Sequence, residues 1–264
     1  MPLAKKRARS YDPAKIRTAV RAQFGHVRTA VESLTPEQLA APTRLGEWTV
    51  RELAAHITMA VNAVGRALDA PAPAKADLTL AVWPTTSAPY AQDIDAYVTE
   101  LAASAEPAAL YGEAAVRLEQ ALADEPGDRI VATRTGALTL ADYLVTRTVE
   151  LVVHTDDLND ALPALAIPYD RQALAACTRL LADALALKAP GASTEVRVPP
   201  FAVVQCVEGP RHTRGTPPNV VETEPLTWIR LATGRLAWQT ALDDAQVSAS
   251  GERADLESLL PIMA

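Results

Sequence analysis

Hydrophobic residues recur at helical spacing in four long segments of the first 162 residues. These segments are residues 12–34, 49–68, 90–123 and 138–162. Apolar positions three and four residues apart line one side of each segment, as expected for amphipathic helices. Pro107 should kink or divide the third segment, because proline cannot donate the helical hydrogen bond. Since a four-helix bundle needs four long helices, we predict such a bundle over residues 12–162.

The pattern changes after Pro163. Residues 170–188 form one more helical segment, and the next two segments, TEVRVPP and FAVVQCVEG, alternate in polarity as strands do. Short helices are predicted in LTWIRLATG and AWQTALDD, a strand in QVSASG, and a last helix in RADLESLL. We therefore expect a two-domain α+β protein, with the helical bundle followed by a small α+β domain over residues 170–264.

A narrow polar stripe runs along the otherwise apolar helix predicted at residues 138–162. Its members are Tyr143, Arg147, Glu150, His154 and Asp157, spaced alternately four and three residues apart. Glu150 and His154 are one turn apart, so their side chains project together and could hold one metal ion. Considered alone, the pattern also fits an ordinary amphipathic helix whose polar side faces water.

His56, on the second predicted helix, is a third candidate ligand. A bundle that binds a metal takes ligands from facing helices, and His56, Glu150 and His154 would leave one coordination position open. Zinc suits two imidazoles and a carboxylate, although iron and nickel accept the same ligands. Glu52 and Asp157, each about one turn from a histidine, could orient the imidazoles. A single histidine in an alanine-rich helix can also be a hydrogen-bonded core residue.

Composition and charge argue against several classes of protein. A net charge of −7 and an isoelectric point near 5.2 do not suit a nucleic-acid-binding surface. No apolar run reaches the roughly 18 residues of a membrane span, and the N-terminus lacks the apolar core of a signal peptide. Cys177 and Cys206 lie among apolar residues, which suggests buried thiols in a reducing compartment rather than a disulfide. We therefore expect a cytoplasmic protein.

Two motifs resemble those of a known family. WTVRELAAHI contains His56, and RTVELVVHTDDL contains Glu150 and His154. They resemble the two signature helices of the mycothiol-dependent maleylpyruvate isomerase family, which belongs to the DinB-like superfamily of metal-binding four-helix bundles. The resemblance covers about 160 residues. It implies that His56, Glu150 and His154 bind zinc and that mycothiol, a small-molecule thiol, is the cosubstrate.

The C-terminal segment resembles the end of sterol-carrier-protein-like domains. The resemblance rests on TGRLAWQTALDDAQVSASGERADLESLL, with its Gly-Arg pair and its Ser-Gly-Glu motif. Asp244 stands where those domains have glycine in a turn, and the apolar face is modest, which does not favour a lipid tunnel. In the isomerase family such a domain follows the bundle and helps to close the active site.

Basic residues could hold an anionic substrate. The loop GPRHTRGTPPN contains Arg211, His212 and Arg214. Guanidinium groups bind carboxylates through paired hydrogen bonds, and Arg147 on the helix that carries Glu150 could do likewise. The same loop could also be an ordinary solvated turn.

These observations and the resemblance predict an enzyme in which a divalent metal, zinc by resemblance, activates mycothiol for addition to a small, electrophilic and anionic substrate. The reaction would be an isomerisation or a thiol transfer. Two other functions fit the residues: a metal-dependent hydrolase with Glu52 as its base, and a non-catalytic carrier that uses the C-terminal domain. The pattern identifies no catalytic residue beyond the candidate metal ligands.

Overall fold

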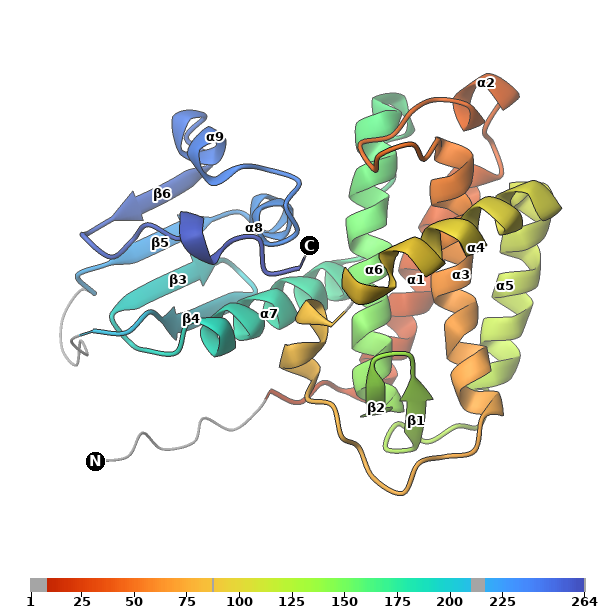
Figure 1. Cartoon of the computed structure of the whole chain (residues 1–264), viewed down its shortest axis with the longest axis horizontal. Coiled ribbons are helices and arrows are strands. Elements are labelled where there is room, and N and C mark those ends of the chain that lie inside the picture. The colour runs from red at the N-terminus through yellow and green to blue at the C-terminus, as the bar shows by residue number, and fades with distance from the viewer. Residues whose placement is uncertain (1–8, 87, 210–216, 264) are drawn as a thin grey trace.

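The structure, a computed structural model, describes residues 9–86, 88–209 and 217–263. Its N-terminal half is built around the predicted four-helix bundle (Figure 1), which consists of α1 (Pro13–Val31), α3 (Val50–Asp69), α5 (Pro107–Leu122) and α6 (Leu140–Ala161). The shorter α4 (Ala91–Ser104) packs across α3, and α2 (Pro36–Leu39) lies between α1 and α3 in the chain. None of the described helices is long and apolar enough to cross a membrane.

Side-chain caps and prolines begin the helices. Asp12 accepts two backbone amide hydrogen bonds at the start of α1. Thr49 and Glu52 form a capping box at the start of α3. Pro107 divides the third predicted segment because it begins α5, where its missing N–H costs no helical hydrogen bond. Two 3-10 segments precede α4: η1 (Leu80–Thr85) and η2 (Ala88–Tyr90).

A β-hairpin lies in the bundle half, and we did not predict it. β1 (Ile130–Thr133) pairs antiparallel with β2 (Gly136–Thr139) directly before α6. We expected residues 12–162 to contain helices and no strands, and this expectation is therefore wrong. The strands are too short to show an alternating pattern, and they are held by Val131 and Leu138, which are buried in the core. Gly136 follows the turn with a φ of 141°, which glycine adopts without strain.

The C-terminal half contains a four-stranded sheet, and three of its strands lie in segments that the sequence predicts as strands. Its strands are β3 (Thr194–Val198), β4 (Ala202–Cys206), β5 (Val220–Thr223) and β6 (Val247–Ser250), in the order β4-β3-β5-β6. β3 and β5 are parallel, and the other neighbouring pairs are antiparallel. The helices of this half are α7 (Arg171–Lys188), α8 (Pro225–Ala232) and α9 (Trp238–Asp243).

The last predicted helix does not form. The segment RADLESLL contains only one 3-10 turn, η4 (Glu257–Leu259). Ala254 and Leu256 are both buried although they are two positions apart, a spacing that puts residues on different sides of a helix. The apolar positions of this segment therefore suit an irregular chain that packs on the core.

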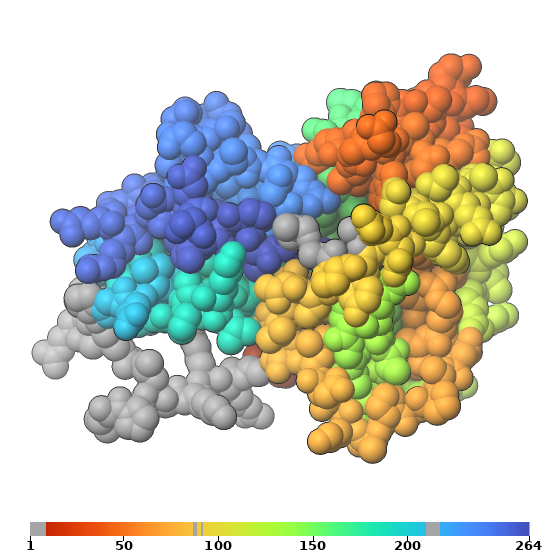
Figure 2. Space-filling view, viewed as in Figure 1, coloured from red at the N-terminus to blue at the C-terminus, as the bar shows by residue number. Residues whose placement is uncertain are grey.

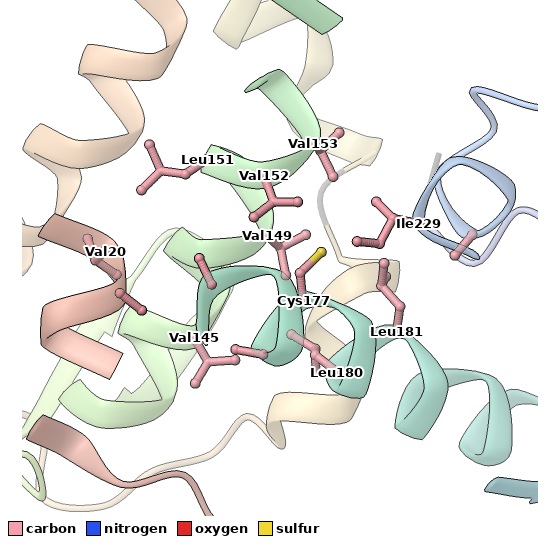
Figure 3. Close-up of a cluster of buried hydrophobic side chains, with 14 of the residues drawn as sticks. Val20, Val145, Val149, Leu151, Val152, Val153, Cys177, Leu180, Leu181 and Ile229 are labelled. Atoms are coloured by element: carbon pink, nitrogen blue, oxygen red, sulfur yellow. The ribbon is translucent and has the colours of Figure 1, made fainter. Parts of the chain in front are cut away.

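α7 joins the two halves. It packs on α1 and α6 of the bundle and also on β4 and α8. Figure 3 shows apolar residues of α6, α7 and α8 in this contact, among them Val145, Val149, Val152, Cys177, Leu181 and Ile229. One hydrophobic core therefore runs through both halves. In the space-filling view, the blue C-terminal segment lies directly beside the bundle (Figure 2).

Candidate metal centre

Three side chains from two facing helices converge inside the bundle half. His56 comes from α3, and Glu150 and His154 come from successive turns of α6. The Nε2 atoms of His56 and His154 lie 3.5 and 3.4 Å from Oε2 of Glu150. The two imidazole rings meet edge to face, with their centroids 4.6 Å apart. The structure thus brings together the three residues that the sequence motifs single out.

These separations suit a shared metal ion. Two ligand atoms about 2.0–2.1 Å from one tetrahedral zinc lie about 3.3–3.4 Å apart. The separations of 3.4 and 3.5 Å found here are close to that value. One ligand atom from each of the three residues lies within 4.8 Å of the others. The set of two imidazole nitrogens and one carboxylate oxygen could therefore hold a divalent ion.

The polar stripe of α6 faces the interior of the protein. His154 and Arg147 are each 8% exposed, and Asp157 is fully buried. α6 is packed by α1, α3 and α7, so its polar side lines a space between elements. The alternative of an amphipathic helix with its polar side in water is therefore wrong for this segment.

Burial and mutual contacts shift the protonation of the three candidate ligands. Burial lowers the pKa of His56 below its usual value. Burial alone would also lower the pKa of His154, but its contacts with Asp157 and Glu150 raise that pKa instead. Burial acts to raise the pKa of Glu150, yet both histidines and Arg147 hold it well below its usual range. Glu150 is thus an ionised carboxylate, ready to bind a cation.

Of the two expected orienting carboxylates, Asp157 contacts a ring nitrogen and Glu52 does not. Nδ1 of His154 lies 2.8 Å from Oδ2 of Asp157, which directs Nε2 toward the other candidate ligands. The Glu52 carboxylate instead accepts the backbone N–H of Thr49 at 2.9 Å. Nδ1 of His56 is buried and has no hydrogen-bond partner within the described ranges. Glu52 therefore caps α3 and leaves His56 without the partner that we expected.

A cavity of about 140 Å³ opens beside the candidate ligands. Arg147 forms part of its wall, and its guanidinium carbon lies 4.9 Å from the ring centre of Tyr143 and 5.8 Å from that of Trp83. One guanidinium nitrogen of Arg147 is 3.8 Å from Oε1 of Glu150. A buried cation therefore lies next to the candidate metal ligands, beside two aromatic rings of the cavity wall.

Several residues of the cavity wall were not predicted from the sequence. Trp83 and Tyr90 come from the 3-10 segments, and Arg134 comes from the turn of the hairpin. None of these short segments has a periodic pattern of apolar residues long enough to predict its place in the cavity wall. Three residues predicted to bind substrate lie outside the described residues: Arg211, His212 and Arg214.

Both cysteines are buried and unpaired, as the sequence predicts. Burial raises the pKa of Cys206 to about 11, and it also raises the pKa of Cys177. Neither residue is part of the cavity wall. A reactive thiol in the cavity would therefore have to come from another molecule.

Two family models match the chain. Residues 20–159 match the mycothiol maleylpyruvate isomerase N-terminal domain, and residues 170–262 match the bacterial SCP ortholog family. A crystal structure of the mycothiol-dependent maleylpyruvate isomerase has a TM-score of 0.61 and 16% sequence identity, covering 93% of this chain and 95% of that chain. A histidine-to-alanine mutant of that isomerase has a TM-score of 0.60, with the same identity and coverage. No curated protein matches the chain.

The comparisons confirm the resemblance that the motifs indicate. At 16% identity the solved structures establish a shared fold. The N-terminal family model goes further, because it covers more than half of the chain. The chain therefore belongs to the mycothiol maleylpyruvate isomerase family of enzymes, with a bacterial SCP-type domain after its helical bundle.

Proposed function

We propose that this enzyme uses a divalent ion, held by His56, Glu150 and His154, to activate a low-molecular-weight thiol for addition to a small anionic electrophile. The observation that carries the proposal is the convergence of these three residues beside a cavity whose wall contains the buried Arg147. The matching family and the two solved structures are named for mycothiol, so mycothiol is the thiol that we propose.

Zinc is the ion that we propose. Two imidazoles and one carboxylate are a known ligand set of catalytic zinc and leave a further position open. When bound, such an ion would lower the pKa of a neighbouring thiol and so supply a reactive thiolate at neutral pH. Iron and nickel accept the same ligands, and elemental analysis distinguishes the three.

The residues around the ligands would prepare the site for both reactants. Asp157 holds Nδ1 of His154 and so leaves Nε2 free to bind the ion. Arg147 would offer its guanidinium group to a carboxylate of the electrophile. Because Arg147 is buried between Tyr143 and Trp83, few water molecules compete for that contact. The electrophile would thus be held next to Glu150, within reach of the activated thiol.

The electrophile would decide the outcome of the reaction. Addition of a thiol to a cis double bond conjugated with a carbonyl group turns that bond into a single bond, which can rotate. Elimination of the thiol then releases the trans isomer, and the reaction is an isomerisation. A substrate that keeps the thiol would leave as a thioether, and the reaction is then a transfer. The cavity of about 140 Å³ suits a small acid in either case.

Two further parts of the proposal, additional substrate contacts and the cellular compartment, rest on residue types rather than on the geometry of the site. Arg211, His212 and Arg214 would supply additional cationic contacts for the substrate, as guanidinium and imidazolium groups do for carboxylates. The reduced thiol cosubstrate and the unpaired Cys177 and Cys206 suit a reducing compartment, so we propose the cytoplasm.

Elemental analysis of the purified protein tests the metal. We expect about one divalent ion per chain in the wild type. His26→Ala is a matched control, because His26 lies on α1 and is not one of the three converging residues. That variant should keep the metal, whereas His154→Ala should lose most of it. Equal metal content in His154→Ala and the wild type would refute the ligand assignment.

Cobalt-substituted protein tests the thiol. Mycothiol should change the visible spectrum through a new sulfur–cobalt bond, and the corresponding alcohol should not. If the protein binds cobalt but no thiol at millimolar concentration changes the spectrum, thiol activation fails. A metal-dependent hydrolase would then be the better account. Its expected base, Glu52, is engaged in the cap of α3, which speaks against that alternative.

A further inference from the structure

We propose that Arg235, from the C-terminal half, is a positioning residue of the metal centre in the bundle. It would act through Asp157 on the imidazole of His154. The inference rests on the proposed metal binding by His56, Glu150 and His154. It goes further because it assigns a residue of the SCP-type half a role in that site.

Asp157 is the link between the two halves. Its carboxylate is fully buried, and Oδ2 lies 2.8 Å from Nδ1 of His154. Arg235 holds the same carboxylate at both oxygens: Nη2 donates to Oδ2 at 3.0 Å, and Nε donates to Oδ1 at 3.2 Å. A paired contact of this kind fixes the plane of a carboxylate as well as its position. The orientation of the imidazole ring therefore depends on a side chain from the other half.

A second arginine completes the enclosure of Asp157. Nε of Arg44, in the segment before α3, donates to Oδ1 at 2.6 Å. Both oxygens of Asp157 are thus occupied, and the carboxylate has no freedom to turn away from His154. A carboxylate held in this way keeps the proton on Nδ1 of the histidine and presents the lone pair of Nε2 to a metal.

The C-terminal half sets the position of Arg235. Arg235 follows α8 after Gly234, whose φ of 72° allows the tight turn there. The backbone N–H of Arg235 donates to the carbonyl of Arg230 at 2.7 Å, and its side-chain Nη1 donates to the carbonyl of Thr233 at 2.8 Å. The guanidinium group is therefore fixed by its own half before it reaches Asp157.

A neighbouring ion pair provides a matched control. Arg230 on α8 donates from Nη2 and Nε to Asp156, at 2.6 and 2.9 Å. Asp156 is almost fully buried and is adjacent to Asp157, but among the described residues it accepts hydrogen bonds from Arg44, Arg230 and Tyr169 and from no candidate metal ligand. Arg230 and Arg235 thus both tie the C-terminal half to α6, and only Arg235 reaches a group that orients a ligand.

The dissociation constant of the metal distinguishes a positioning role from simple attachment of the two halves. It can be measured on full-length proteins by competition of zinc with a chelator of known affinity. Arg235→Ala should weaken zinc binding about 10-fold or more, as loss of an orienting group does. Arg230→Ala should bind zinc like the wild type. Arg235→Lys keeps the charge but loses the paired geometry, so its affinity should be intermediate.

Thermal melts of the metal-free proteins show whether each variant folds. If Arg235→Ala does not fold, the zinc affinity of Arg235→Lys is compared with that of Arg230→Ala instead. Arg235→Lys should still bind zinc more weakly than Arg230→Ala. If a folded Arg235 variant and Arg230→Ala have the same affinity, the positioning role is refuted while the proposed metal site stands. If the wild type binds no metal, both proposals fail together.

Discussion

His154 and Asp157 lie three residues apart on α6, with Nδ1 of the imidazole 2.8 Å from Oδ2 of the carboxylate. This spacing puts both side chains over one turn, so the helix that carries a candidate ligand also carries the group that orients it. Glu150 lies on the same helix, four residues before His154. Much of the site is therefore fixed by a single rigid element, which favours a defined metal geometry.

Glu150→Gln should cost metal binding and leave stability nearly unchanged. Glutamine has the shape of glutamate, so no void forms, but the site loses the single carboxylate of its three converging residues. We expect the metal affinity to fall by at least the roughly 10–100-fold that loss of an orienting group costs. Chelator competition and thermal melts of the metal-free protein measure the two effects.

The adjacent Leu151→Ala is the control for Glu150→Gln. Leu151 is 1% exposed and packs in the core, so its truncation should cost roughly 2–5 kcal/mol of unfolding free energy. Its effect on metal affinity should be small. Full metal occupancy in Glu150→Gln would show that Glu150 is not a ligand.

Arg147→Met should impair capture of the substrate without impairing the metal. Methionine keeps most of the length of the side chain. It removes the guanidinium charge that we propose binds the substrate carboxylate. Loss of a charged hydrogen bond costs about 1.5–3 kcal/mol, so kcat/KM should fall about 10- to 150-fold. Metal affinity should stay the same or rise, because a positive charge near Glu150 is removed.

Arg66→Ala provides the comparison for Arg147. Arg66 also lines the cavity, but its side chain is exposed to water and its charge is screened. We expect a much smaller change in kcat/KM. Equal losses in Arg66→Ala and Arg147→Met would mean that general positive charge, rather than a specific contact of Arg147, holds the substrate.

Thiol reagents should react slowly with the native protein. Burial raises the pKa of Cys206 to about 11 and also raises that of Cys177, so both thiols stay protonated near neutral pH. Only as the pH approaches these raised values would thiolate form. A colorimetric disulfide reagent should detect the two cysteines after denaturation and almost none before it. A fast native reaction would instead point to an internal thiol nucleophile.

We propose residues 163–169 as the boundary between the domains, and proteolysis there should not separate the halves. Pro163 is exposed, although Asn159 holds Ile167 nearby through hydrogen bonds of 2.8 and 3.0 Å. Because α7 packs on both halves, the two fragments should elute together from a native sizing column. Separation under native conditions would contradict the shared core, and earlier cleavage elsewhere would contradict the proposed boundary.

The proximity of the Glu150 and His154 side chains could be predicted from the sequence, because helical spacing alone places them together. The segment that carries them has no glycine or proline before Pro163, so the helix and its i,i+4 geometry follow from the pattern. The approach of His56 is a tertiary contact between helices. It could be expected only because its motif resembles that of a known family.

The rest of the site depends on contacts that no local pattern encodes. Trp83 and Arg134 lie in a 3-10 segment and a hairpin turn, whose positions follow from packing against the bundle. Arg44 and Arg235 are distant in the chain, yet both reach Asp157. Periodicity relates neighbouring residues along one helix or strand, and it carries no information about tertiary contacts between distant segments.

The hairpin before α6 places Thr133, Arg134 and Thr135 in the cavity wall, while its strands form a two-stranded sheet of their own. Exchange of these three side chains would therefore change the wall of the cavity that we propose for the electrophile and leave α3 and α6 untouched. For directed evolution, a library confined to residues 133–135 would search for new acid substrates with little risk to the metal site or the core.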